Sequence, residues 1–165
     1  MVACFASTAQ ELAFELQSSV PHWAVLKLSK SGLLSQLNLI APINPFYQRG
    51  DFDGDGTLDI AIWVKNRKSG KLGIAVIPRG PGKVSWVGAG HQLVDRTGNV
   101  LWPNGDTLDW IGAWYVYEKG AVGQGATDEP PPKLKGDALM LIELESASGL
   151  LYWTGQRYAW YQQGD

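Results

Sequence analysis

The clearest pattern along the chain is an alternation of side chains between residues 58 and 65. In an extended strand, successive side chains point to opposite faces, so every second residue shares a face. One face would carry Leu58, Ile60, Ile62 and Val64, and the other Asp59, Ala61, Trp63 and Lys65. A polar stretch at residues 66–70 follows, and the apolar segment 72–77 then returns along the strand. The pattern therefore predicts an antiparallel hairpin.

Other apolar and aromatic segments predict the remaining elements. Strands are expected at residues 23–29, 84–87, 110–117 and 138–144, with a closing hairpin of residues 150–153 and 158–161. Residues 9–18 are predicted to form an N-terminal helix that Pro21 ends, because apolar residues recur there at helical spacing. Residues 31–48 are expected to be loop-like with one helical turn at 33–37, and residues 120–135 to form an exposed loop. The expected fold is α+β, a mainly antiparallel β-sheet with an N-terminal helix packed on it.

The composition is that of one globular domain, which we expect to span residues 10–165. The chain has 165 residues, of which 45% are hydrophobic and 18% charged, and its formal net charge is −2. A single Cys excludes a disulfide framework and a Cys-based zinc site. Because no block of Lys or Arg occurs, a nucleic-acid partner is not expected. The longest uncharged stretch, residues 31–48, contains prolines and amides, so no transmembrane segment is predicted either.

The strongest chemical motif is the acidic segment between Gly50 and Ile60. Its nine-residue loop carries Asp51, Asp53, Asp55 and Asp59 at positions 1, 3, 5 and 9. Carboxylates this close either raise one another's pKa or are neutralised by a cation. Gly54 and Gly56 permit the positive φ angles of a tight wrap. All-oxygen ligation suits Ca²⁺ better than Mg²⁺, so we expect a calcium site formed by the four carboxylates and the Thr57 carbonyl.

The loop differs from an EF-hand in two respects. The twelfth position counted from Asp51 is Ile62 instead of the bidentate Glu, and a strand pattern follows instead of a helix. The DxDGDGxxD segment leading into a strand resembles the calcium loop of FG-GAP (VCBS-type) repeats, the blade unit of integrin α-chain propellers. The resemblance implies Asp51, Asp53, Asp55 and Asp59 as side-chain ligands of Ca²⁺ and Thr57 as a carbonyl ligand. Because a propeller needs several blades of about 40–45 residues and only one full loop occurs, a complete propeller is not expected.

The chain is also similar to a loosely described group of single-loop exported bacterial proteins. The similarity rests on Pro21-His22-Trp23 before the loop and Tyr152-Trp153-Thr154-Gly155 in the closing hairpin. Residues 1–9 fit the end of a secretory signal, with small residues Ser7-Thr8-Ala9 before Gln10. Two alternatives for this segment are a lipoprotein-like Val2-Ala3-Cys4 box and a capping box, Thr8 to Glu11, of the N-terminal helix. Export to the periplasm or the cell exterior would expose the loop to abundant calcium.

The predicted function is that of a non-enzymatic, exported calcium-binding protein. A structural calcium ion would fix a surface for a protein partner, including the toxin of an inhibitor- or immunity-type protein, or for an envelope glycan. The chain has 8 Trp, which could stack on sugar rings or fill the core, and the core is the favoured place for most of them. The alternative is a polysaccharide- or peptidoglycan-directed hydrolase that uses acidic residues such as Glu143 and Glu145. No catalytic residue is assigned, because no nucleophile or metalloprotease motif occurs.

Overall fold

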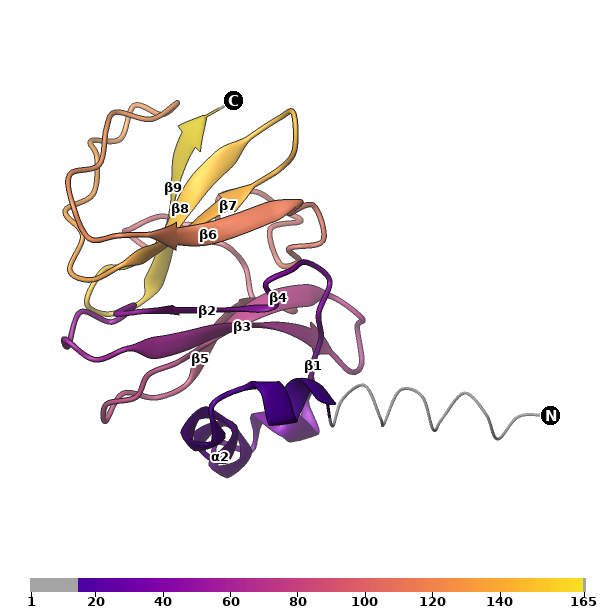
Figure 1. Cartoon of the computed structure of the whole chain (residues 1–165). Coiled ribbons are helices and arrows are strands. Elements are labelled where there is room, and N and C mark those ends of the chain that lie inside the picture. Colours follow the sequence, from indigo (N-terminus) through magenta and orange to yellow (C-terminus); the bar gives the residue numbers. More distant parts are fainter. Residues whose placement is uncertain (1–14, 165) are drawn as a thin grey trace.

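The computed structural model describes residues 15–164 and consists mainly of two antiparallel sheets that face each other (Figure 1). The first sheet contains β1 (Leu37–Leu39), β2 (Tyr47–Gly50), β3 (Asp59–Asn66), β4 (Leu72–Ile77) and β5 (Ser85–Gly88). The second is a meander of β6 (Ala113–Tyr117), β7 (Ala138–Ile142), β8 (Ser148–Trp153) and β9 (Tyr158–Gly164). The mainly antiparallel architecture predicted from the sequence is confirmed, although the strands form two sheets instead of one.

Strand β3 organises the first sheet. Its one edge pairs with β4 from Ile60 to Lys65, which confirms the hairpin predicted from the alternation. Its other edge accepts two short strands end to end. Strand β2 pairs with the first half of β3, and β1 pairs with the second half. Residues 31–48 were expected to be loop-like, and this prediction is wrong for β1 and β2. Both strands are short and mixed in composition, and hydrogen bonding to β3 stabilises them.

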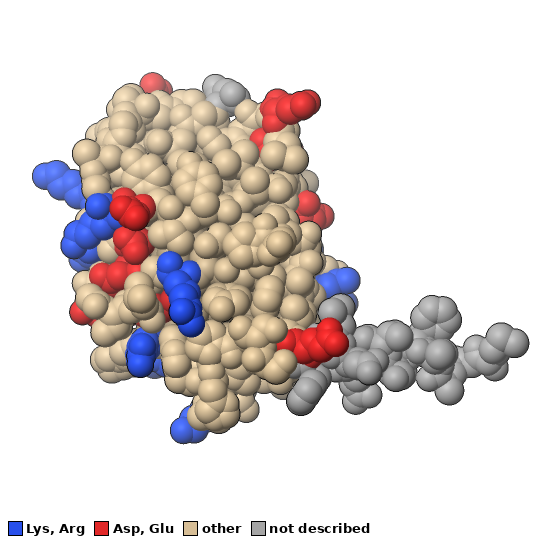
Figure 2. Space-filling view, in the orientation of Figure 1, with Lys and Arg blue, Asp and Glu red and all other residues tan. Residues whose placement is uncertain are grey.

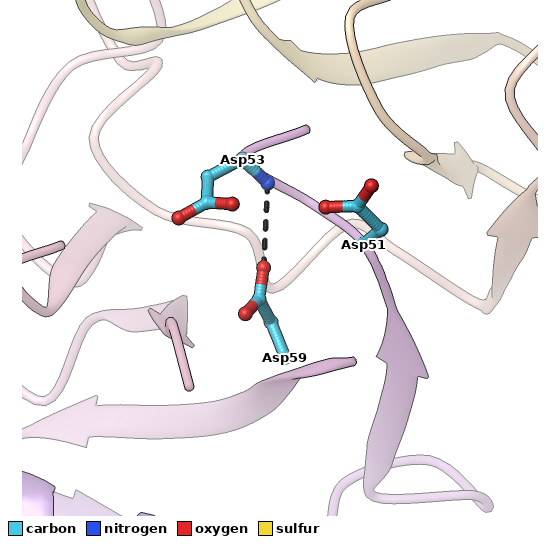
Figure 3. A group of neighbouring side chains, drawn as sticks. All are labelled: Asp51, Asp53 and Asp59. Carbon is cyan, nitrogen blue, oxygen red and sulfur yellow. Dashed lines mark hydrogen bonds between the residues drawn. The ribbon is translucent and has the colours of Figure 1, made fainter. Parts of the chain in front are cut away.

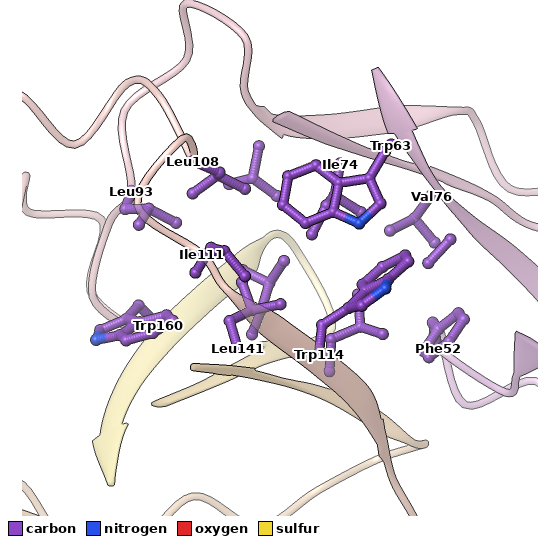
Figure 4. Packing of buried hydrophobic residues seen from close by; sticks show 14 residues of the cluster. Phe52, Trp63, Ile74, Val76, Leu93, Leu108, Ile111, Trp114, Leu141 and Trp160 are labelled. Atoms are coloured by element: carbon purple, nitrogen blue, oxygen red, sulfur yellow. The ribbon is translucent and has the colours of Figure 1, made fainter. Parts of the chain in front are cut away.

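The two faces of β3 enter different hydrophobic clusters, because alternate side chains point in opposite directions. Ala61 and Trp63 lie between the two sheets, in the larger cluster drawn in Figure 4. Ile60, Ile62 and Val64 lie on the other face and contact the cluster beneath the helix α2. Strand β3 is therefore buried on both faces, which agrees with its continuous apolar stretch from Ile60 to Val64.

The helix α2 (His22–Lys30) covers the outer face of the first sheet (Figure 1). Residues 23–29 were predicted as a strand, and this prediction is wrong. Ala24 and Leu28 are buried about one helical turn apart, and Val20, just before the N-cap residue Pro21, is buried with them. The 3-10 turn η1 (Leu33–Ser35) confirms the predicted helical turn. The predicted helix at residues 9–18 lies mostly outside the described residues. Within the described part of the chain, residues 15–19 are helical.

The long segment between β6 and β7 has no regular secondary structure at residues 120–135, as predicted. It is not exposed throughout, because Val122 and Leu134 pack against a third cluster on the outer face of the second sheet. In the part of the chain that the structure describes, no helix is both long enough and apolar enough to cross a bilayer.

Candidate metal centre

The acidic loop connects β2 to β3 and is closed by their pairing. Gly50 and Asp59 are directly opposite each other in the ladder, so the residues between them form the hairpin loop. Gly54 and Gly56 have φ angles of +79° and +87°, as the tight wrap requires. The loop therefore returns the chain on itself and brings Asp51 near the start of β3.

Three carboxylates converge in this loop. Asp51, Asp53 and Asp59 each offer an oxygen, and these oxygens all lie within 4.8 Å of one another (Figure 3). The Oδ1 atom of Asp51 is buried and accepts no hydrogen bond within residues 15–164. A buried carboxylate oxygen without a partner is costly, and a bound cation removes that cost. The donor set and the unsatisfied oxygen both fit an oxygen-liganded divalent ion.

Asp59 is the innermost of the three carboxylates, with 0% of its surface exposed. Its Oδ2 accepts hydrogen bonds from the amides of Phe52 at 3.0 Å and Asp53 at 3.3 Å, and its Oδ1 accepts one from Arg79 at 2.8 Å. Burial raises the pKa of Asp59 to about 6, and the negative charge of Asp53 contributes to this increase, whereas the amide donors oppose it. The carboxylate is thus oriented by backbone groups, and among residues 15–164 it forms no ion pair.

The other predicted ligands divide into two groups. Asp53 belongs to the converging cluster, and burial together with the charges of Asp55 and Asp51 raises its pKa. Asp55 lies on the exposed part of the loop, outside that cluster, and Thr57 is exposed beside it. The Oδ1 of Asp55 accepts hydrogen bonds from the Thr57 amide at 2.8 Å and the Thr57 hydroxyl at 2.6 Å, which lower its pKa. The structure therefore brings together three of the four carboxylates that the sequence indicated.

Asp137, just before β7, also belongs to the site but was not identified from the sequence. Its Oδ2 accepts a hydrogen bond from the Asp51 amide at 2.9 Å, and its own amide donates to the Asp51 carbonyl at 2.7 Å. Its Oδ1 accepts from the Lys119 amide at 2.9 Å. The approach is close, since a Cβ on Gly136 would lie 2.0 Å from the Asp51 carbonyl oxygen. The acidic loop of the first sheet is thus attached to the second sheet.

A cleft of about 480 Å³ opens beside the loop, and Asp53 forms part of its lining. Trp86 of β5 and Trp153 of β8 also line it, and both are partly exposed. Tyr158 borders the same cleft and donates a hydrogen bond to the Phe52 carbonyl at 3.3 Å. The loop is therefore connected to one wall of the cleft through Tyr158.

The tryptophans divide between this cleft and the hydrophobic core. Trp63, Trp114 and Trp160 are buried between the sheets. The rings of Trp63 and Trp114 meet edge to face with 5.3 Å between their centres. For these three residues, the expectation that tryptophan fills the core is confirmed.

The two glutamates considered for hydrolase chemistry lie in the β7–β8 turn. Strand β7 ends at Ile142, two residues earlier than predicted, and Glu143 donates its amide to the Ala147 carbonyl across the turn. Glu145 has a φ of 60° and is exposed. The strand predicted at residues 138–144 therefore stops before both glutamates, which lie in the turn.

Comparisons of the chain with family models, with curated proteins and with solved structures found no match.

Proposed function

We propose that this protein binds one Ca²⁺ ion in the loop from Asp51 to Asp59 and that the ion is structural. The observation that carries the proposal is the convergence of three carboxylates, one of which, Asp51, has a buried Oδ1 atom that accepts no hydrogen bond within residues 15–164. Carboxylate oxygens are the ligands that Ca²⁺ prefers, and its flexible coordination suits a loop. The Asp55 side chain and the Thr57 carbonyl would complete the ligand set, as in the FG-GAP loops that this segment resembles.

The structural role follows from the position of the loop. Without a cation, three carboxylates repel one another at the junction of the two sheets, and the buried Asp59 has no ion-pair partner in the described part of the chain. A bound ion would reverse this repulsion and hold Asp51 in the geometry that Asp137 recognises. Because the unfolded chain does not gather these carboxylates, binding free energy becomes folding free energy.

We further infer that the protein is exported and non-enzymatic and that it presents the surface beside the loop to a protein partner or an envelope glycan. The cleft next to Asp53 supports a binding role, because it combines exposed aromatic rings with polar groups. Asp53 is the single carboxylate in the lining of this cleft, whereas glycoside hydrolysis commonly uses two. A binding protein therefore agrees better with the cleft than a hydrolase does.

Thermal unfolding in chelator, Ca²⁺ and Mg²⁺ tests the calcium proposal. A Ca²⁺ concentration about 100 times the Kd should add about 2.7 kcal/mol to the free energy of unfolding, and Mg²⁺ should add less. Asp53→Asn should abolish this stabilisation, because it removes one of the converging charges. Asp109→Asn is the matched control, since Asp109 is exposed and lies outside the loop. Equal unfolding temperatures of the unmodified chain in Ca²⁺ and in chelator would overturn the proposal.

A further inference from the structure

The cleft beside the acidic loop has the size and composition of a ligand site. Its volume of about 480 Å³ falls within the range of about 300–1,000 Å³ usual for small-molecule sites. It lies between the sheets, bounded by β5 on one side and the β8–β9 turn on the other. Figure 2 shows that charged side chains of both signs gather at the left of the molecule, where Figure 1 places the β2–β3 loop and the β8–β9 turn.

Each sheet supplies one aromatic pair to this cleft. Trp86 of the first sheet is stacked on His91, with 4.4 Å between ring centres and an angle of 28° between the planes. The ring centres of Trp153 and Tyr158, both of the second sheet, lie 5.0 Å apart. All four rings line the cleft, and pairing restricts the motion of each one. Restrained, partly exposed rings lose little entropy on contact with a ligand, and their faces suit the C–H surfaces of sugar rings.

The charged side chains of the cleft favour a ligand with a negative charge. Lys83 and Arg157 line it, and neither forms an ion pair within residues 15–164. The Arg157 guanidinium donates one long hydrogen bond, at 3.4 Å to the Thr97 carbonyl, so most of its donors are available. The opposing charge is Asp53, which belongs to the converging carboxylate cluster. When a cation neutralises that cluster, the cleft presents two positive side chains to a ligand.

Polar groups around the rings complete the site. The amides of Gln92 and Gln156 and the hydroxyl of Ser85 line the cleft and can both donate and accept hydrogen bonds. A ligand that matches this lining has apolar ring faces, several hydroxyls and a negative charge. Sugar rings that bear a carboxylate have all three properties, and guanidinium groups bind carboxylates through paired donors.

We propose that the cleft between β5 and the β8–β9 turn binds an acidic saccharide, with Trp86 and Trp153 as ring contacts and Lys83 and Arg157 as carboxylate contacts. The inference rests on the proposed calcium site in one respect, because calcium would neutralise Asp53 at the edge of the cleft. Acidic saccharide should therefore bind more weakly in chelator than in Ca²⁺.

Isothermal titration with two defined probes tests this inference. A hyaluronan tetrasaccharide, in which glucuronate alternates with N-acetylglucosamine, should bind at least about tenfold more tightly than neutral chitotetraose. Trp153→Ala should weaken hyaluronan binding by about tenfold or more, since it removes one stacking ring. Lys83→Gln, at an exposed position, should reduce the preference for the acidic probe without affecting folding. Tyr115→Ala is the aromatic control, because Tyr115 is exposed on β6 outside the cleft.

The outcomes separate this inference from the calcium proposal. No hyaluronan binding by a chain that Ca²⁺ stabilises would overturn the saccharide site and leave the calcium site supported. Equal affinity for the two probes would overturn the assignment of Lys83 and Arg157 as carboxylate contacts. Equal binding in Ca²⁺ and in chelator would overturn the role of calcium in neutralising Asp53. A chain that Ca²⁺ does not stabilise would contradict the calcium proposal itself, whatever saccharide binds.

Discussion

Asp59 and Asp55 belong to the same loop, but their surroundings shift their acidities in opposite directions. Asp59 is fully buried, so its charged form is disfavoured and its pKa rises. Asp55 is exposed, and the hydrogen bonds from Thr57 favour its charged form and lower its pKa. The buried carboxylate therefore gains most from a cation, and protons and Ca²⁺ should compete for it.

This competition predicts how calcium stabilisation depends on pH. Burial raises the pKa of Asp59 from 3.8 to about 6, so between these pH values the folded chain holds a proton that the unfolded chain has released. In chelator, stability from this group is therefore present below about pH 4 and lost as the pH rises through about 6. Bound Ca²⁺ keeps the carboxylate ionised in the folded state and should remove that loss, which is about 3 kcal/mol at most.

The measurement is urea unfolding between pH 4 and pH 7.5, in saturating Ca²⁺ and in a chelator that is effective over this range. The difference in unfolding free energy between the two conditions should increase with pH and level off above about pH 6. A difference that is constant over the whole range would mean that Asp59 does not contact the ion.

Single residues also mark the limit of prediction from the sequence. The spacing of Asp51, Asp53 and Asp59 indicated the converging carboxylates, because a loop between paired strands must fold back on itself. Asp137 could not be identified in this way. It contacts Asp51 from 86 positions away along the chain, and no local pattern reports a contact that only the packing of two sheets creates.

At the scale of secondary-structure elements, the β2–β3 loop depends on two glycines with positive φ that differ in their surroundings. A Cβ on Gly54 would lie 2.7 Å from the Lys135 carbonyl oxygen, whereas a Cβ on Gly56 would have no neighbour within 4 Å. The first glycine therefore permits both a turn and a close contact, and the second permits a turn alone.

The two glycines form a matched pair of substitutions. Gly56→Ala should lower the free energy of unfolding by about 1–2 kcal/mol, the cost of a left-handed conformation for a residue with a side chain. Gly54→Ala should cost more, because the segment at Lys135 must also move. Urea unfolding in Ca²⁺ measures both values. Equal losses for the two variants would show that the nearby Lys135 backbone does not restrict the side chain at position 54.

Secondary-structure elements were predicted correctly where apolar and polar residues alternate over a long segment, and wrongly where the pattern is short. The β3–β4 and β8–β9 hairpins were predicted from alternating residues on both sides of a polar turn. Residues 23–29 are mostly apolar, and a short apolar run can form either a strand or a buried helix face. The repeat of Val20, Ala24 and Leu28 indicates the helix, but it becomes evident only when the residue before Pro21 is included.

At the scale of the whole molecule, the acidic loop lies where the two sheets meet. It belongs to the first sheet through β2 and β3, and Asp137 attaches it to the start of β7 in the second. An ion in the loop would therefore stabilise the packing of both sheets, and with it the cleft between them.

The attachment predicts the effect of removing Asp137. Asp137→Ala would leave the Asp51 and Lys119 amides without their acceptor and should lower the free energy of unfolding by about 1–3 kcal/mol. It should also weaken Ca²⁺ binding by about tenfold, because residues that position metal ligands tune the affinity. Asp128→Ala is the control at an exposed site and should change stability by less than about 0.5 kcal/mol. Unchanged calcium affinity in Asp137→Ala would show that the second sheet does not support the site.

The central claim is that the converging carboxylates bind one calcium ion, and calorimetric titration of Ca²⁺ into chelator-treated protein tests it most directly. We expect one ion per chain in the unmodified protein and no measurable binding after Asp51→Asn combined with Asp53→Asn. Absence of binding by the unmodified chain, or undiminished binding by the double variant, would contradict the account.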